Sequence, residues 1–165
     1  MFEPSANVSE AFFRHLVQTH ALGHRGFHGE DHWRRVLFNG RMLAAATGAN
    51  LKVVELFALV HDSRRENEDH DPEHGLRAAH HARTLRETWF DASDDEMELL
   101  TEACRLHSDG LTAGDLTVRV CWDADRLDLG RVGLRPSARY LCTDHARRPE
   151  VIAAAYRRSL LGADA

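Results

Sequence analysis

The stretch LFALVHDSRRE, residues 56–66, decides how this sequence folds, because a run of five apolar residues ends directly in His61 and Asp62. Upstream, Val53, Phe57 and His61 recur at four-residue spacing, which places the imidazole on the apolar face of a predicted helix. The polar pair either marks a helix reaching the surface or supplies two ligands to a metal ion. The rest of the sequence must distinguish these two interpretations.

The composition bounds the class of protein. The chain has 165 residues, of which 43% are hydrophobic, so we expect one domain over 1–165. A net charge of −5 argues against general nucleic-acid binding, which needs a basic surface. Three scattered cysteines without a C-x-x-C pair predict reduced thiols and a cytoplasmic protein. We expect no signal peptide and no membrane association, since no apolar run approaches ~18 residues.

Helical periodicity dominates the whole chain, and strand-like alternation is nearly absent. We therefore predict an all-α fold of seven or eight helices. Asp31 is a candidate N-cap, and SDDE at Ser93–Glu96 is a capping box. The predicted helices cover approximately residues 6–20, 31–47, 51–63, 73–88, 93–107, 116–129, 137–145 and 149–161.

Among 12 histidines, a few occupy helix positions that point inward. His32 borders the apolar face of its predicted helix, and His107 follows an apolar face as His61 does. Asp125 lies in register with apolar residues of the helix over 116–129. Buried imidazoles and carboxylates are costly unless they have partners, and a shared divalent metal ion would satisfy all four.

With these residues in this order, the sequence resembles the HD-domain superfamily of metal-dependent phosphohydrolases. The segments GEDHWRRV, ALVHDSRR and DADRLDLGRVG resemble its ordered signature of one histidine, a His-Asp pair and a distal aspartate. The resemblance covers 28–133 and implies a single HD-domain helical bundle. It also implies a metal site made by His32, His61, Asp62 and Asp125, suited to Mn²⁺, Mg²⁺, Fe²⁺, Co²⁺, Ni²⁺ or Zn²⁺.

The segment DADRLD offers three aspartates for the distal ligand position. In related hydrolases the ligand is the aspartate of an A-D-x-L core, which corresponds to Asp125. Helical periodicity alone leaves Asp123 open as well. We expect Asp123 and Asp128 to orient ligands or arginines around the metal.

Some members of the superfamily hold a second metal ion with two further histidines. His74 and His107 are the candidates in this chain. His80 and His81 compete with His74, but we interpret that pair as a solvent-exposed helix edge. One metal ion is the favoured expectation, with the second left open.

The resemblance implies that a metal-activated water attacks a phosphate ester or anhydride of a nucleotide or small phosphorylated metabolite. The residues 130–140, GRVGLRPSARY, have the Gly and Pro content of a loop that could close over such a substrate. The catalytic candidates are Asp62, His107 and Arg64, and the substrate-binding candidates are His28, Arg35, Arg65 and Arg126.

The sequence is also compatible with two other functions. A branch of the same superfamily uses a di-iron centre as an oxygenase, which would require both His74 and His107 as ligands. A metal-bound HD domain could also bind a nucleotide without catalysis. Oligomeric state and the substrate itself are not indicated by any motif.

Overall fold

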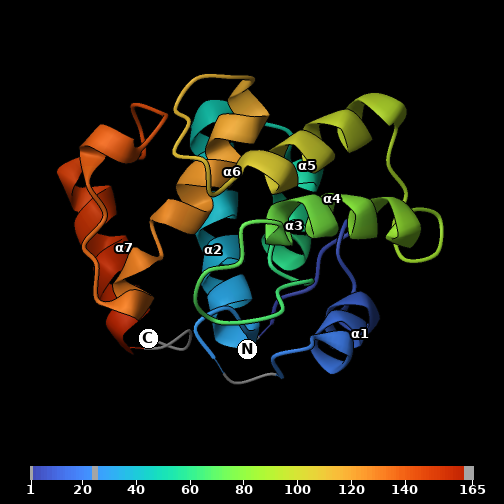
Figure 1. Ribbon diagram of the computed structural model, residues 1–165. Helices are drawn as coiled ribbons and strands as arrows, with labels where there is room; N and C mark the ends of the chain where they lie inside the picture. Colours follow the sequence, from blue (N-terminus) through green and yellow to red (C-terminus); the bar gives the residue numbers. More distant parts are fainter. Residues whose placement is uncertain (1, 24–25, 162–165) are drawn as a thin grey trace.

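The protein is built from helices, as the sequence predicts. A computed structural model describes residues 2–23 and 26–161, and these contain no β-strand. Seven α-helices and two short 3₁₀ helices follow one another along the chain (Figure 1). They are α1 (Glu10–Thr19), α2 (Glu30–Thr47), α3 (Leu51–Val60), α4 (His74–Leu85), α5 (Asp94–Leu106), α6 (Leu116–Arg126), η1 (Leu129–Val132), η2 (Ala138–Tyr140) and α7 (Pro149–Leu161). No helix among the described residues is long and apolar enough to cross a membrane.

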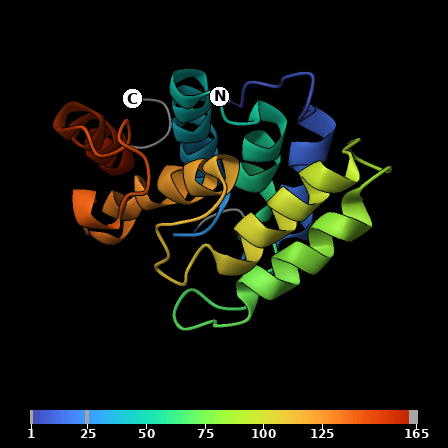
Figure 2. The same ribbon diagram turned by 90° about the horizontal axis from the view of Figure 1, so that it is seen from above.

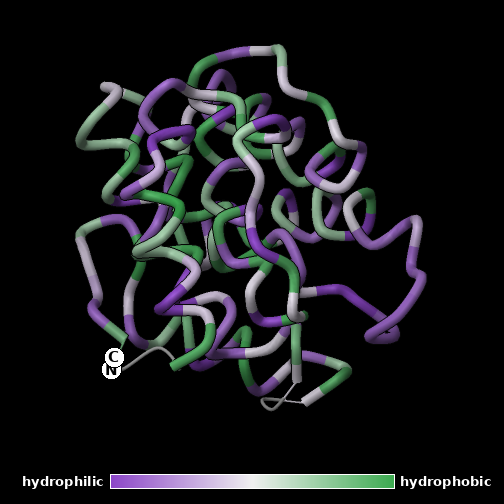
Figure 3. Tube along the Cα trace, turned by 90° about the vertical axis from the view of Figure 1, so that its left-hand side faces the viewer, coloured by the Kyte–Doolittle hydropathy of each residue, from purple (hydrophilic) through white to green (hydrophobic). Residues whose placement is uncertain are grey.

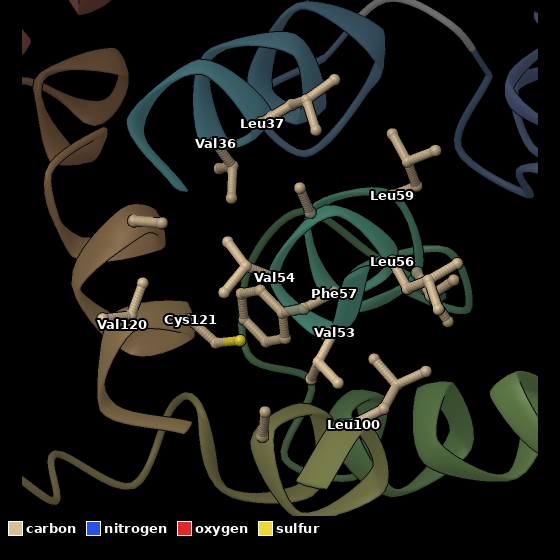
Figure 4. Close-up of a cluster of buried hydrophobic side chains, with 14 of the residues drawn as sticks. Val36, Leu37, Val53, Val54, Leu56, Phe57, Leu59, Leu100, Val120 and Cys121 are labelled. Atoms are coloured by element: carbon tan, nitrogen blue, oxygen red, sulfur yellow. The ribbon is translucent and has the colours of Figure 1, made fainter. Parts of the chain in front are cut away.

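The apolar helix α3 forms the centre of the core. Every residue from Val53 to Val60 is buried, so this helix is covered on all sides (Figure 4). Val36 of α2, Leu100 of α5 and Val120 of α6 approach it from different directions. Apolar segments run through the middle of the molecule and hydrophilic ones lie mostly toward its edges (Figure 3). The core therefore fixes the end of α3, where His61 and Asp62 follow.

Helices α4 and α5 lie side by side in close contact (Figure 2). The contact is close because Gly75 has no side chain: a Cβ atom there would lie 2.6 Å from the carbonyl oxygen of Cys104. The capping box predicted at Ser93 is present, with Glu96 as its reciprocal partner. This pair of helices brings the start of α4 to the end of α5.

The predicted helix over 137–145 is wrong. Only a 3₁₀ turn, η2, forms there, and the following residues are held away from helical geometry by Asp123. Its carboxylate accepts hydrogen bonds from the backbone N–H groups of Cys142 and Thr143, at 2.6 and 2.8 Å. Asp31 is not an N-cap either, because α2 begins one residue earlier with Gly29 in the cap position.

Candidate metal centre

A cluster of buried histidines and aspartates lies where five helices end or begin. His61 and Asp62 follow α3, His74 begins α4, and His107 caps the C-terminus of α5. His32 in the first turn of α2 and Asp125 near the end of α6 complete the set. Five of these six residues are buried, and the side chain of Asp125 is 15% exposed.

The first half of the cluster groups two imidazoles with two carboxylates. His32 Nε2 and His61 Nε2 are 3.1 Å apart. Asp62 Oδ2 lies 3.5 Å from each of these nitrogens. Asp125 Oδ1 lies 3.4 Å from His32 Nε2 and 3.8 Å from His61 Nε2. Four ligand atoms therefore converge on one small space.

The second half uses the other oxygen of the same aspartate. His74 Nε2 and His107 Nε2 are 2.8 Å apart. Asp62 Oδ1 lies 3.5 Å from the first nitrogen and 3.6 Å from the second. Asp62 thus stands between two groups of ligand atoms, each of which could hold a metal ion.

Hydrogen bonds at the Nδ1 atoms of the four imidazoles determine their tautomers. The Nδ1 atoms of His61, His74 and His107 face the carbonyl oxygens of Phe57, Asp71 and Cys104, respectively. His32 Nδ1 lies 2.7 Å from Asp128 Oδ2. Because each Nδ1 carries the donated proton, each Nε2 presents a lone pair to its partner. Two facing lone pairs require a positive charge between them.

The pKa directions agree with one positive charge in each pair. Burial and Arg131 act to lower the pKa of His32, but Asp125, Asp128 and Asp62 outweigh them and raise it to about 9. Burial lowers the pKa of its partner His61 to about 3.

In the second pair, Asp62 outweighs burial to raise the pKa of His107, whereas burial and the neighbouring His107 lower that of His74. A metal ion in each group can replace the proton that each pair would otherwise share.

The carboxylates of Asp62 and Asp125 are also suited to binding metal ions. The Oδ1 atoms of Asp62 and Asp125 are buried and accept no hydrogen bond from described residues. Burial acts to raise their pKa, but the surrounding histidines outweigh it, so the pKa of both stays well below the usual range. Two nitrogens bound at about 2.1 Å to one ion with bonds at right angles lie about 3 Å apart. The observed Nε2 separations match this value, so the residues present fit a pair of divalent ions.

The structure separates the three aspartates near the end of α6. Asp125 faces the cluster, whereas Asp123 points away from it and accepts from Cys142 N, Thr143 N and Thr143 Oγ1. Asp128 accepts from His32 Nδ1 and, at 2.6 Å, from Arg35 Nε. Asp128 therefore orients a ligand and an arginine, as expected, whereas Asp123 holds a backbone segment.

The candidate arginines have different surroundings. Arg65 lies nearest the cluster, with Nη1 3.7 Å from Asp62 Oδ1. Arg35 is bound to Asp128, and Arg64 Nη2 lies 2.8 Å from His81 Nε2. Arg126 donates to the Tyr140 carbonyl and to Cys142 Sγ, and its guanidinium makes no hydrogen bond or ion pair with the cluster among the described residues.

Periodicity did not identify Arg131, which lies beside the cluster. Its Nη2 is 3.8 Å from Asp125 Oδ1, and its Nε donates to the carbonyl of Phe27. It sits in η1, within the predicted substrate loop, but a Gly-flanked arginine gives no signal that separates it from a surface residue. His28 lies next to the cluster residue His32, with ring centroids 6.1 Å apart, and its Nδ1 is 2.5 Å from Glu68 Oε2.

The expectation for the two adjacent histidines of α4 is half wrong. His80 is exposed, as predicted, but His81 is buried. Its ring lies between Ser63 Oγ, 2.9 Å from Nδ1, and the guanidinium of Arg64. It supports the turn that follows Asp62 and makes no hydrogen bond or ion pair with the six cluster residues.

Comparisons with protein-family models, with curated proteins and with solved structures find no match for this chain. The all-helical fold and the buried histidine–aspartate cluster are compatible with an HD domain.

Proposed function

We propose that this chain is an HD-domain phosphohydrolase with a dinuclear metal centre. The observation that carries the proposal is the position of Asp62 between two facing imidazole pairs. Residues His32, His61, Asp62 and Asp125 would hold one ion, and Asp62, His74 and His107 the other. Bound divalent ions would lower the pKa of a bound water and polarise a phosphoryl oxygen.

Two arginines near the cluster are suited to binding a phosphorylated substrate. The guanidinium of Arg65 lies 3.7 Å from the carboxylate of Asp62, and that of Arg131 lies 3.8 Å from the carboxylate of Asp125. Arginine matches the oxygen geometry of phosphate and keeps its charge, so both groups can neutralise phosphoryl oxygens. Arg64, Arg35 and Arg126 are engaged elsewhere, which makes them weaker candidates for substrate contact.

His28 can hold and move a proton beside the cluster. Its Nδ1 is bound to Glu68, which leaves Nε2 free to exchange a proton with a reacting group. Burial lowers the pKa of His28, so the imidazole is neutral near pH 7 and can accept a proton at that atom. We assign proton transfer to His28 and metal binding to His107.

The test combines metal analysis with a panel of phosphorylated metabolites. The wild-type protein should retain two equivalents of a divalent metal and release phosphate from at least one member of the panel. Asp62→Ala should lose both metal equivalents and the activity, because it removes the shared ligand. Asp91→Ala, an exposed aspartate, is the matched control and should behave as wild type. Full phosphate release by metal-free Asp62→Ala would refute the proposal.

A second candidate is a di-iron oxygenase. The specific observation in its favour is that all six ligands that such a centre needs converge, including His74 and His107. Iron as the retained metal, together with substrate-dependent oxygen consumption, would favour it. Phosphate release under anaerobic conditions with Mn²⁺ or Mg²⁺ would favour the hydrolase.

A further inference from the structure

A cavity of about 740 Å³ lies at the opposite end of α2 from the metal centre. It is bounded by the end of α2, the loop before α6 and the segment 142–148. His32 is in the first turn of α2 and Thr47 is its last residue, so the rise per residue separates them by roughly 20 Å. Figure 1 shows α2 running between these two ends. None of the residues that line the cavity belongs to the cluster of six, so the cavity is separate from the candidate metal centre.

Positive charge dominates the wall of this cavity. Arg119, Arg147 and Arg148 line it together with the half-buried His145. The single carboxylate in the wall, Asp144, has a fully exposed side chain and lies 3.5 Å from Arg147. Such a wide ion pair at the surface is weak and leaves the arginine available. The cavity thus offers about two uncompensated positive charges, an environment that favours an anion.

Several donors in the wall have no partner within the described part of the chain. The guanidinium of Arg119 makes no hydrogen bond or ion pair to a described residue, and only its Nε is shielded from solvent. The backbone N–H groups of Thr112, Ala113 and Gly114 donate to no described residue. The side chain of Arg148 is likewise free of hydrogen bonds and ion pairs to described residues. A ligand with several acceptor oxygens would satisfy these donors together.

Hydrogen bonds to residues outside the cavity fix the position of its wall. Asp123 binds Cys142 and Thr143 through three accepted hydrogen bonds. Arg147 Nε donates to the carbonyl of Leu141 at 2.9 Å, which directs this side chain along the same segment. A preformed wall lowers the entropy cost of binding, because little of the chain must be ordered by the ligand.

We propose that this cavity binds a small phosphorylated molecule at a site distinct from the metal centre. The volume lies within the range of small-molecule pockets and exceeds what a lone inorganic ion needs. Arginines and backbone N–H groups match the tetrahedral array of phosphate oxygens, and arginine can do so in a bidentate manner. The wall residues Arg119 and Arg148 are the principal phosphate contacts.

Hydrogen–deuterium exchange of the purified, metal-containing protein tests the site, with inorganic phosphate as the probe. Phosphate should slow exchange in residues 110–116 and 141–148 of the wild type, in a saturable manner. In the double variant Arg119→Gln/Arg148→Gln, the apparent affinity for phosphate measured from this protection should fall by about tenfold or more. The reason is that each charge-assisted contact that is lost contributes substantially to binding. The charge-matched control Arg105→Gln/Arg157→Gln, at exposed arginines outside the cavity, should retain it.

Arg148→Gln alone guards against misfolding of the double variant, because the side chain of Arg148 is exposed and makes no hydrogen bond or ion pair with a described residue. It should weaken the protection on its own while leaving the unfolding temperature unchanged. Equal loss in the control pair, or unchanged protection in Arg148→Gln and the double variant, would overturn the proposal. Protection confined to residues around the metal centre, or absent everywhere, would overturn it as well. None of these results depends on whether the metal centre hydrolyses phosphate.

Discussion

Asp128 and His32 are joined in the core by a hydrogen bond of 2.7 Å from Nδ1 to Oδ2. Both side chains are almost completely buried, and the second oxygen of Asp128 is bound to Arg35. The aspartate therefore fixes the rotation of the imidazole and keeps Nε2 directed at the cluster. It acts on the candidate metal centre without contributing a ligand atom to it.

Asp128→Asn should weaken metal binding by about 10–100-fold, as is common when the group behind a histidine ligand is altered. The asparagine can present its amide to the ring in either orientation, so the tautomer of His32 is no longer fixed. Competition with a chromogenic chelator measures the change in affinity. Asp115→Asn, at the exposed start of α6, serves as the control. Wild-type affinity in Asp128→Asn would show that the orientation of His32 is set by packing alone.

Asp123 and Asp125 should respond oppositely to substitution. Asp123→Ala leaves the buried N–H groups of Cys142 and Thr143 without an acceptor, which should lower the free energy of unfolding by about 3 kcal/mol. Metal retention should persist in the fraction that stays folded. Asp125→Asn should instead lose metal while the circular dichroism spectrum remains helical. Urea denaturation and metal analysis of both variants distinguish the two roles.

The sequence could place the ligand residues on helices but not divide their tasks. Asp123 and Asp125 are two residues apart on α6, and the apolar pattern around them is compatible with either facing inward. What separates them is the extended segment at Cys142, whose N–H groups bind Asp123. That contact joins residues far apart in the chain, and local periodicity carries no information about it.

The sequence favours one metal ion and does not establish a second group of candidate ligands, for a similar reason. His74 begins α4 after a loop, so the periodicity of that helix does not indicate where its side chain points. The close packing of α4 on α5 at Gly75 brings it to His107. By contrast, the central helix and its His-Asp end were predictable, because a fully apolar run determines its own burial. Arg131 could not be recognised, since its role depends on the path of the chain after α6.

Gly75→Ala should open the contact between α4 and α5. The new Cβ would lie 2.6 Å from one backbone carbonyl oxygen of α5 and 3.0 Å from the next, and neither can move alone. Overpacking of this kind costs about 1–3 kcal/mol, offset by up to about 1 kcal/mol of helix propensity. Because His74 adjoins this position, the pairing with His107 should loosen and the metal content should fall from two equivalents toward one.

Leu76→Ala is the control for that experiment, because Leu76 is 41% exposed and lies next to the same glycine. It should keep both metal equivalents. Plasma emission spectroscopy of both variants, purified in parallel, measures the metal content. Two equivalents retained in Gly75→Ala, despite a lower unfolding temperature, would mean that helix spacing does not control the second group of ligands.

His81 should make the stability of the fold depend on pH. Burial, followed by the charges of Arg64 and His15, lowers the pKa of His81 to about 4. In the unfolded chain this imidazole takes up a proton near pH 6.5, whereas in the folded protein it stays neutral down to about pH 4. The contribution of His81 to stability is therefore complete above pH 6.5 and is lost progressively as the pH falls toward 4.

His81→Gln removes this titration and keeps groups that can bond to Ser63 and Arg64. The difference in free energy of unfolding between wild type and variant should shrink by about 1–2 kcal/mol between pH 7 and about pH 4.5, after allowance for partial solvent screening. Urea denaturation at a series of pH values measures it. His80→Gln, at the exposed neighbour, is the matched control and should run parallel to wild type. A constant difference across this range for His81→Gln would mean that its imidazole titrates as it does in the unfolded chain.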